Sequence, residues 1–529
     1  MIFEQAWEVC NKVGGIYTVI SSKARFYVEK YGKRYFLIGP YKDNKEFIEN
    51  KKPEWLENIS KNLEKIGIKI HYGNWNIKGN PQVILIDFYE FFNKERNFWK
   101  YLFWEWYKID SLNSDFTYDE PFVWSISAGI LLEHIDKIFP ERKILHAHEW
   151  LSGGTILYIK KKNLNYKTIF TIHGTVMGRY LSSKGIKVSK EINFDSESYK
   201  YNINAKHQLE KNTVLHTDIF TTVSDILDEE AKIIFGRKSD KILYNYLDIE
   251  NFEIGEKRYL KEFIIWYFYP YYEIDLERTI FIYTIGRYEF LNKGYDLFID
   301  LLKYLNESDI DFNIIAFIFV PFHNKGINPN VKYLYNLYLS LKEKLNSLDT
   351  LRDIYRKKLN IELEKIEGYP PISTHITEND ITNKIIQSNL LNRKEDKVKV
   401  VYVPTYIGND EIFNDKELLK EFDIGVFLSR YEPYGYTPLE ALNNGIPIIL
   451  SNKTGFYLSL KKKNIKSDSI LVVDLDNFNN ELKRILSFIK DYFYLNKTDK
   501  IKIRCEAFNI SLLYSWEKNI NEYFELYKY

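Results

Sequence analysis

The stretch FLSRYEPYGYTPLEALNNGIPII, from Phe427 to Ile449, decides the fold of the second half of this chain. An apolar run from Ile424 to Leu428 predicts a buried strand, Gly435 marks a turn, and a helical pattern follows. Pro438 suits the first turn of that helix, where a missing N–H group costs nothing. The order of strand, glycine turn and helix is typical of a parallel α/β sheet.

The same turn is a candidate site for a pyrophosphate. The first N–H groups of a helix have no partner inside the helix, so they point at the turn and favour negative charge there. Glu432, on the strand side, is placed to face a sugar, and Glu440, on the helix, to reach a ribose. The turn between them consists of Tyr434, Gly435, Tyr436 and Thr437. A structural turn with two solvated glutamates explains this pattern about equally well.

The chain has 529 residues, which predicts more than one domain. Its composition predicts a soluble, cytoplasmic protein. Lys plus Arg (74) and Asp plus Glu (73) nearly cancel, which argues against a nucleic-acid or membrane-surface partner. Cys10 and Cys505 are too few for a disulfide framework, and the first residues lack the pattern of a signal peptide. The longest apolar runs, 263–269 and 314–320, are far shorter than the ~20 residues of a membrane span.

Short apolar runs alternate with helical patterns along most of the chain, which predicts two parallel α/β domains. The strands expected in the first half are 34–38, 83–88, 143–146, 168–172 and 219–223. Those expected in the second half are 279–285, 313–320, 397–403, 424–428, 446–449 and 469–473. The alternation stops over 246–277, so we place the boundary between the domains there.

Leucines recur every three or four residues from Val331 to Ile366, which predicts one long amphipathic helix or a pair of helices. This segment interrupts the second domain and is interpreted as a helical insertion over 325–395. Such a long apolar stripe needs a partner. We expect a homo-oligomer, a trimer or tetramer, built through the insertion. The alternative is a helix folded back on its own domain.

The loop NKVGGI, from Asn11 to Ile16, is a second candidate phosphate site. Gly14 and Gly15 let the backbone approach a ligand closely, the helical pattern that follows presents its positive end, and Lys12 adds a cation. The loop matches neither the Walker nor the dinucleotide fingerprint, and a structural turn is an equally good explanation.

His173 and Arg179 follow the strand expected at 168–172, and the carboxyl ends of parallel strands are where α/β proteins bind ligands. A neutral imidazole there suits a sugar hydroxyl, and the planar fork of Arg179 suits a phosphate. Taken singly, a loop-capping histidine and a surface arginine are the more common explanation.

His146, His148 and Glu149 suggest a zinc site by residue type. The two histidines fall on one strand face, but no distant third ligand is evident. We therefore favour a structural or substrate-wall role and expect neither a metal nor another cofactor. The nearest match to a metal-binding Asp-X-Asp motif, Asp474 to Asp476, follows a late strand and is interpreted as a solvated loop.

Arg287 and Lys293, in the stretch GRYEFLNKG, follow the strand expected at 279–285. Two cations beside a strand end suit a departing pyrophosphate, whose negative charge grows as the glycosidic bond breaks. The alternative is a surface ion pair between Arg287 and Glu289, which contributes little.

Together these segments resemble the glycogen synthases of the eukaryotic and archaeal type, which are retaining glycosyltransferases of family 3. The matching stretches are AWEVCNKVGGIYTVISSKA from Ala6, HAHEWLSGG from His146, TIFTIHGTVMGRYL from Thr168, FTTVSD from Phe220, YTIGRYEFLNKGYDLFI from Tyr283, PPIST from Pro370, KVKVVYVP from Lys397 and GVFLSRYEPYGYTPLEALNNGIPIILSN from Gly425. They follow the order of the family over nearly the whole chain, and the helical insertion lies where the family has one.

The resemblance implies the GT-B fold, which has two Rossmann-like domains facing a cleft. The first would span 1–250, completed by a C-terminal helix over 505–529, and the second would span 251–504. It also implies transfer of glucose, with retention, from UDP-glucose or ADP-glucose to the non-reducing end of an α-1,4-glucan such as glycogen. The alternatives are a GT-B transferase with a different acceptor and a catalytically weak glucan-binding assembly protein.

The resemblance assigns roles to the candidate residues named above. The catalytic residues would be Glu432, Arg287, Lys293 and His173. The nucleotide sugar would be bound by Lys12, Gly14, Gly15, Arg179, Tyr434, Gly435, Tyr436, Thr437 and Glu440.

Three features depart from the family pattern. Tyr246 stands where the family usually has Gly, and Tyr434 stands where Trp is common. The eukaryotic branch has an Arg-rich helix near its C-terminus that binds glucose 6-phosphate, whereas this chain has only Lys500, Lys502 and Arg504 there. We therefore expect weak or no activation by glucose 6-phosphate.

Overall fold

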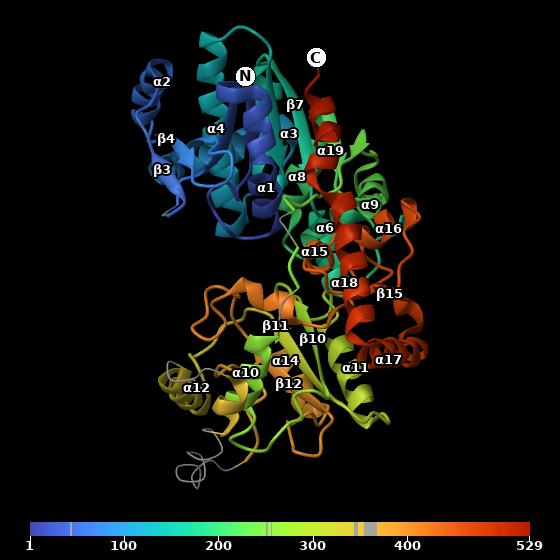
Figure 1. Ribbon diagram of the computed structural model, residues 1–529. Coiled ribbons are helices and arrows are strands. Elements are labelled where there is room, and N and C mark those ends of the chain that lie inside the picture. Colours follow the sequence, from blue (N-terminus) through green and yellow to red (C-terminus); the bar gives the residue numbers. More distant parts are fainter. Residues whose placement is uncertain (43–44, 250–251, 255–256, 343–346, 354–367, 529) are drawn as a thin grey trace. The chain divides into compact units, whose positions relative to one another are not determined.

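The computed structural model describes residues 1–42, 45–249, 252–254, 257–342, 347–353 and 368–528 (Figure 1). The chain divides into two compact units, one of Met1–Asp248 with Tyr514–Tyr529 and one of Ile249–Leu513. Each unit contains a largely or wholly parallel sheet together with helices, as the alternating sequence pattern predicts.

The sheet of the first unit has the strand order β3-β4-β5-β2-β1-β6-β7-β8-β9 in the described residues. Neighbours from β5 to β9 are parallel, whereas β3 and β4 are antiparallel additions at one edge. The strands are β1 (Ile2–Gln5), β2 (Tyr35–Pro40), β3 (Phe47–Glu49), β4 (Lys69–Trp75), β5 (Gln82–Asp87), β6 (Lys143–His148), β7 (Tyr166–Ile172), β8 (Ile219–Thr222) and β9 (Lys241–Ile242). The helices are α1 (Gly15–Tyr31), α2 (Glu54–Glu64), α3 (Tyr89–Tyr107), α4 (Phe116–Ile138), α5 (Gly153–Lys162), α6 (Val176–Ser183), α7 (Phe194–Lys200), α8 (Asn204–His216), α9 (Asp225–Phe235) and α19 (Trp516–Phe524).

The sheet of the second unit has the order β12-β11-β10-β13-β14-β15, and every pair in it is parallel. The strands are β10 (Thr279–Ile285), β11 (Asn313–Phe319), β12 (Val398–Val403), β13 (Ile424–Phe427), β14 (Ile448–Ser451) and β15 (Ile470–Val473). The helices are α10 (Arg258–Tyr267), α11 (Tyr295–Glu307), α12 (Pro329–Lys342), α14 (Asp380–Gln387), α15 (Tyr436–Asn443), α16 (Gly455–Lys462), α17 (Phe478–Tyr494) and α18 (Lys497–Ser511). Strand β12 is buried along its whole length, as expected for a parallel sheet covered on both faces.

The C-terminal helix α19 belongs to the first unit and packs on α1 (Figure 1). Trp516 Nε1 donates a hydrogen bond of 2.7 Å to Ser22 Oγ of α1. Tyr246, where the family usually has Gly, is fully buried beside α19, and its hydroxyl donates to Glu522 at 2.8 Å. Its backbone lies outside the left-handed region, so this position does not require glycine here.

Helix α12 contains the first part of the predicted apolar stripe, and it packs on α10 of its own unit. Leu334 and Leu341 are buried, and the ring of Tyr335 lies 5.4 Å from that of Trp266 in α10. The alternative of a helix folded back on its own domain therefore holds for α12. The rest of the predicted stripe, apart from residues 347–353, lies outside the described residues.

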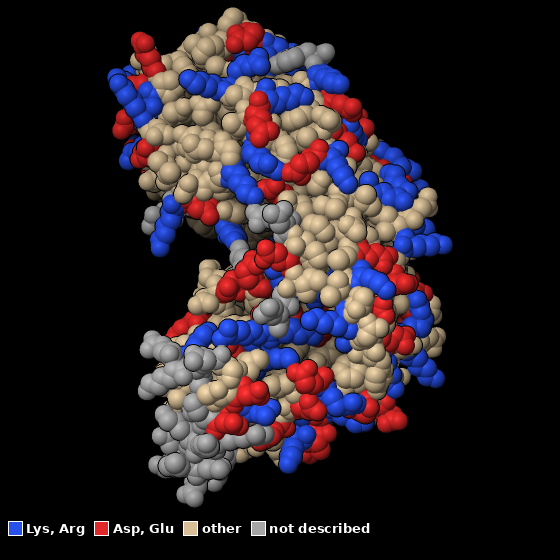
Figure 2. Space-filling view, viewed as in Figure 1, with Lys and Arg blue, Asp and Glu red and all other residues tan. Residues whose placement is uncertain are grey.

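Among the residues that the structure describes, no helix has the length and apolar character needed to cross a membrane. On the face drawn in Figure 2, basic and acidic side chains are interspersed rather than separated. This mixing agrees with the formal net charge of +1.

Candidate active site

Candidate residues of the first unit gather at the carboxyl ends of three neighbouring parallel strands. Strands β1, β6 and β7 are adjacent in the sheet. Glu4 lies near the end of β1, His148 ends β6, and His173 follows β7. Parallel α/β sheets bind ligands at this edge.

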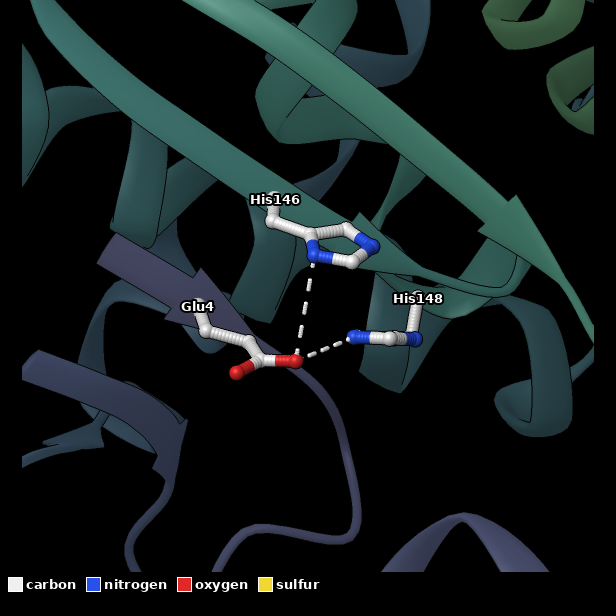
Figure 3. A group of neighbouring side chains, drawn as sticks. All are labelled: Glu4, His146 and His148. Carbon is white, nitrogen blue, oxygen red and sulfur yellow. Dashed lines mark hydrogen bonds and ion pairs between the residues drawn. The ribbon is translucent and has the colours of Figure 1, made fainter. Parts of the chain in front are cut away.

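Glu4 is fully buried and lies at the centre of a polar network (Figure 3). Its Oε1 is 2.5 Å from Lys23 Nζ and 2.7 Å from His148 Nε2, and its Oε2 accepts from the Tyr35 hydroxyl at 2.5 Å. Burial opposes ionisation, but the Lys23 ammonium and the hydrogen bond from His148 hold the pKa of Glu4 well below its usual range. Glu4 is therefore a buried carboxylate whose charge is matched by Lys23.

His146 points toward the same carboxylate but is held by other partners (Figure 3). Its Nδ1 lies 2.6 Å from the Tyr527 hydroxyl and its Nε2 lies 2.7 Å from Thr171 Oγ1. Burial is the main cause that lowers the pKa of His146 well below its usual range, so the ring is neutral. His146 thus links β6 to β7 and to the C-terminal segment.

Glu4, His146 and His148 each offer one ligand atom within 4.8 Å of the others, a spacing that a metal ion could bridge. No distant third ligand was evident from the sequence, yet the fold supplies one, Glu4, from another strand of the sheet. The Lys23 ammonium already contacts the Glu4 oxygen that faces the histidines, and it would repel a second cation. Glu149 does not join this group, since its Oε1 accepts from the backbone N–H of His173 at 2.8 Å.

His173 is connected to this network through His148, whose Nδ1 lies 3.0 Å from His173 Nε2. The carbonyl of His173 accepts from Arg179 Nη2 at 3.5 Å. Burial is the main cause that lowers the pKa of His173 well below its usual range, so its ring is neutral. A neutral imidazole at a strand end suits recognition of an uncharged hydroxyl group.

Arg179 lies on α6, which begins directly after the loop of His173. Thr175 caps this helix, and its Oγ1 accepts from the N–H of Gly178 at 2.9 Å. Gly174 lets the arginine lie against the loop, because a Cβ at this position would come within 2.5 Å of Arg179 Nε. His173 and Arg179 both follow β7, as the sequence predicted, and the arginine contacts the backbone of the histidine.

The N-terminal glycine loop binds a carboxylate of its own chain. Glu8 Oε2 accepts from the N–H groups of Gly14 and Tyr17, each at 2.8 Å. Lys12 is exposed, with its ammonium 5.5 Å from the centre of the Tyr17 ring. The sequence interpretation missed Glu8, yet this contact shows that the N–H groups of the loop converge on an anion.

In the second unit, Gly435 gives the predicted turn its shape. It has a φ of 105° and is the N-cap residue of α15, which begins at Tyr436 and has Thr437 in its first turn. The carbonyl of Glu432 accepts from the N–H of Gly455 at 3.0 Å, which ties the turn to α16.

Aromatic packing and burial surround the same turn. The ring of Tyr434 is buried, with ring centres 5.9 Å from Tyr436 and 6.2 Å from Phe456. Glu440 lies on α15, and its charge adds to burial in raising the pKa of Tyr283. Both predicted residues therefore lie beside the turn, Tyr434 within the fold and Glu440 on the helix.

Lys293 and Glu432 form an ion pair, and only 13% and 18% of their side chains are exposed. Gly294 precedes α11 and has a φ of 67°, a conformation that favours glycine. Its lack of a side chain lets the loop after β10 lie close to the end of β13. A Cβ at Gly294 would lie 2.0 Å from the carbonyl oxygen of Leu428, at the end of β13. The sequence placed Lys293 and Glu432 after two expected strands, 279–285 and 424–428, but did not predict their contact.

Arg287 is about half exposed and its Nη2 lies 3.1 Å from Glu289 Oε1. The surface pair that was the alternative interpretation is thus present in this structure. The backbone of Arg287 is held in place by Tyr295, whose hydroxyl donates to the Arg287 carbonyl at 2.9 Å. Arg287 therefore has a fixed backbone and a side chain that reaches solvent.

The two carboxylates of the Asp-X-Asp segment serve different partners. Asp474 accepts from the side-chain amides of Asn452 and Asn477, each at 2.7 Å. Asp476 pairs with Lys453 and is exposed. Asp474 therefore caps its loop, and Asp476 belongs to a surface ion pair.

Besides Glu8, sequence reasoning missed Glu4 and Lys23. A signal was present, because Glu4 stands inside the apolar start MIFEQAW, which forms a buried strand. A charged residue in such a strand is rare unless it is paired. Its partner follows 19 residues later on a helix, so only the fold brings the two together.

The family described as glycogen synthase matches this chain over residues 4–359 and 335–528. The glycogen [starch] synthase of Dictyostelium discoideum is 31% identical, and the alignment covers 98% of this chain and 65% of that protein. The human liver enzyme is 32% identical over 86% of this chain and 72% of its own length. Isoform 2 of Saccharomyces cerevisiae is 29% identical over 99% of this chain and 85% of its own length.

Solved structures with the same fold include the catalytic domain of starch synthase IV from Arabidopsis thaliana, bound to ADP and acarbose. It has a TM-score of 0.56 and 15% identity, covering 99% of this chain and 98% of that one. Sucrose-phosphate synthase from Thermosynechococcus elongatus has a TM-score of 0.54 and 13% identity, with coverages of 99% and 98%. At these identities the likeness concerns the fold alone, which is GT-B. The family match covers almost the whole chain, and two parallel-sheet domains carry the motif residues at their strand ends, so this chain belongs to the glycogen synthase family.

Proposed function

We propose that this protein is a retaining glycosyltransferase that transfers glucose from a nucleoside diphosphate to the non-reducing end of an α-1,4-glucan. The observation that carries the proposal is the ion pair of Lys293 and Glu432 beside the glycine turn that starts α15. It places a carboxylate, a cation and a helix N-terminus in one place. A sugar carried on a diphosphate calls for these three groups.

In this proposal each charged residue meets one part of the donor. Glu432 contacts the glucose and stabilises the positive charge that develops on the ring in the transition state. Lys293 and Arg287 hold the departing diphosphate, whose negative charge grows as the bond breaks. In the first unit, His173 binds a sugar hydroxyl.

The transfer proceeds on one face of the sugar. The bond between the anomeric carbon and the phosphate oxygen breaks, and the bond from that carbon to the acceptor hydroxyl oxygen forms. The hydroxyl proton passes to the departing phosphate oxygen, so no protein base is needed. This route retains the configuration of the anomeric carbon.

The diphosphate is bound by cations and N–H groups rather than by a metal. The N–H groups of Gly14 and Tyr17, which now bind the Glu8 carboxylate, support this part of the proposal because they already favour an anion. Lys12 and Arg179 add two cations in the first unit. In the second unit Tyr436 and Thr437 present the start of α15.

The experiment that tests the function is incubation with UDP-glucose or ADP-glucose, with and without glycogen, while nucleotide release and glucan growth are measured. We expect growth that depends on both donor and glycogen, with UDP-glucose preferred. Nucleotide release without glucan growth would favour a different acceptor. Glycogen binding without nucleotide release would favour the assembly protein.

We also propose a cytoplasmic protein that assembles as a trimer or tetramer through the insertion. The cytoplasmic location is supported by Cys10 and Cys505, which are both free. Assembly is supported by the outer face of α12, where Tyr333 and Leu339 are exposed while the opposite face is buried.

A further inference from the structure

Four residues form a continuous line of polar contacts from the core of the first unit to the candidate site. Lys23 Nζ lies 2.5 Å from Glu4 Oε1, Glu4 Oε1 lies 2.7 Å from His148 Nε2, and His148 Nδ1 lies 3.0 Å from His173 Nε2. The first three residues are at most 1% exposed, and His173 is 8% exposed. Only the last residue of the line therefore reaches the surface.

The inner end of this line cannot easily rotate. The Lys23 ammonium lies over the rings of Tyr27 and Tyr523, at 5.2 and 4.9 Å from their centres. Glu4 is fixed through its second oxygen, which accepts from the Tyr35 hydroxyl. The carboxylate therefore presents one fixed oxygen to His148.

The contacts determine where the protons are. An ionised carboxylate only accepts hydrogen bonds, so the Nε2 of His148 must carry a hydrogen. Burial lowers the pKa of His148 more than Glu4 raises it, so the ring is neutral and its Nδ1 has no hydrogen. A bare nitrogen can only accept, and His173 Nε2 must therefore be the donor across the 3.0 Å contact.

We infer that Glu4 and His148 are positioning residues, which hold His173 in its Nε2–H form so that its bare Nδ1 accepts a hydrogen bond from a hydroxyl of the donor sugar. The inference rests on the proposed function for the identity of this ligand. The tautomer itself follows from the contacts within the protein. An imidazole without this support would exchange between its two forms and would offer the acceptor for only part of the time.

The direct test is nitrogen NMR of the full chain, labelled with 15N in its nine histidines and free of ligand. Long-range proton–nitrogen spectra distinguish the two neutral tautomers and the imidazolium, and single substitutions assign the signals. We expect His148 and His173 both as neutral Nε2–H rings. An Nδ1–H form or an imidazolium at His173 would overturn the inference, whatever the enzyme does.

Two substitutions on the same strand separate positioning from general packing. In His148→Phe, the His173 Nε2–H loses its acceptor, so we expect a mixture of tautomers and a kcat roughly tenfold lower, by analogy with residues that orient a functional histidine. In the control His146→Gln, the contact between His148 and His173 remains, so the His173 tautomer should not change. A pure Nε2–H form in folded His148→Phe contradicts the role of His148, and the spectrum of the unmodified protein decides the question if that variant does not fold.

Addition of donor separates this inference from the proposed function. UDP-glucose, but not UDP, should shift the His173 Nδ1 signal in the direction of an accepted hydrogen bond. An unmoved signal in a protein that elongates glycogen overturns the sugar contact and leaves the function intact. An Nε2–H form in a protein that transfers no glucose supports the positioning role and counts against the function alone.

Discussion

Lys293 and Glu432 form an ion pair that joins the loop after β10 to the loop after β13, two strands that are neighbours in the sheet. Both side chains are largely buried, so neither charge is fully hydrated when the other is removed. Each residue had been assigned to a different part of the donor, the diphosphate and the sugar. Their contact makes those two parts of the proposed site one electrostatic unit.

Glu432→Gln should lower glucose transfer by roughly 10²-fold or more while donor binding survives. The reason is that an amide keeps the size of the side chain but removes the negative charge that opposes the charge on the sugar in the transition state. Initial rates of nucleotide release give the loss, and calorimetric titration with UDP-glucose gives the binding. Turnover close to that of the unmodified enzyme would remove Glu432 from the mechanism.

Asp476→Asn is the matched control for that substitution. Asp476 also pairs with a lysine in the second unit, Lys453, but its carboxylate is exposed and follows β15, whereas Lys453 follows β14. Loss of an exposed ion pair changes little. We expect transfer within about twofold of the unmodified enzyme, and a large loss would show that removal of any carboxylate in this unit is harmful.

Transfer should not need a divalent metal. Arg287 and Lys293 supply positive charge for the diphosphate, and Asp474 and Asp476 have separate partners rather than a shared site. Rates should therefore be equal in EDTA and in Mg²⁺ or Mn²⁺. Activity that disappears in EDTA and returns with either metal would contradict this prediction.

Glucose 6-phosphate should have little effect, because Arg504, Lys500 and Lys502 of α18 already have partners. Arg504 is buried and donates to the carbonyls of Phe422 and Lys420 at 2.9 and 2.6 Å. Lys500 Nζ donates to a backbone carbonyl at 2.8 Å, and Lys502 lies 2.8 Å from an aspartate. A several-fold rise in rate at millimolar glucose 6-phosphate would contradict the prediction.

The same contacts predict what removal of Arg504 does. Arg504→Ala leaves two carbonyls of the second unit without a donor, at a cost of about 1–3 kcal/mol for each buried group. Its effect should therefore appear as a lower urea midpoint and not as a change in regulation. An unchanged midpoint together with altered sugar-phosphate response would indicate a ligand contact instead.

Acid should destabilise the first unit in part through His207 of α8. Burial is the main cause that lowers the pKa of His207 to about 4, although Asp195 raises it. The unfolded value is about 6.5, so below that pH the unfolded chain binds a proton that the folded chain does not. The stability that comes from keeping His207 unprotonated in the fold is fully present above pH ~6.5. As the pH falls toward ~4, the free energy of unfolding decreases by about 2–3 kcal/mol.

His207→Asn should reduce this pH dependence, measured as urea unfolding of the full chain at pH ~7 and ~4.5. His216→Asn is the control, because His216 lies exposed on the same helix. A slope that is equal in both variants would show that other groups cause the acid sensitivity.

Periodicity predicted most of the fold because parallel strands that are buried on both faces form continuous apolar runs. The strand expected at 279–285 matches β10 residue for residue. The antiparallel edge formed by β3 and β4 was missed because its short, mixed sequences lack such a run. At the candidate site, the sequence was enough to predict the position of single loops. It did not predict pairs such as Glu4 with Lys23, because no local sequence pattern encodes a contact between distant residues.

The insertion gives the last prediction, which is a homo-oligomer that uses the outer face of α12. Because Leu341 is buried within its own unit, its replacement by Glu would destabilise that unit rather than test assembly. The exposed residues Tyr333 and Leu339 are 48% and 41% accessible, and they are the ones to change. Tyr333→Lys with Leu339→Glu should give monomers that still bind UDP-glucose, because the turn at Gly435 is left intact.

A matched pair of changes at exposed residues of α3, Phe98→Lys with Tyr101→Glu, should leave the assembly unaltered. Light scattering gives the mass of each protein: a single species of one chain, 63.4 kDa, in the unmodified protein even at high concentration would rule out the assembly.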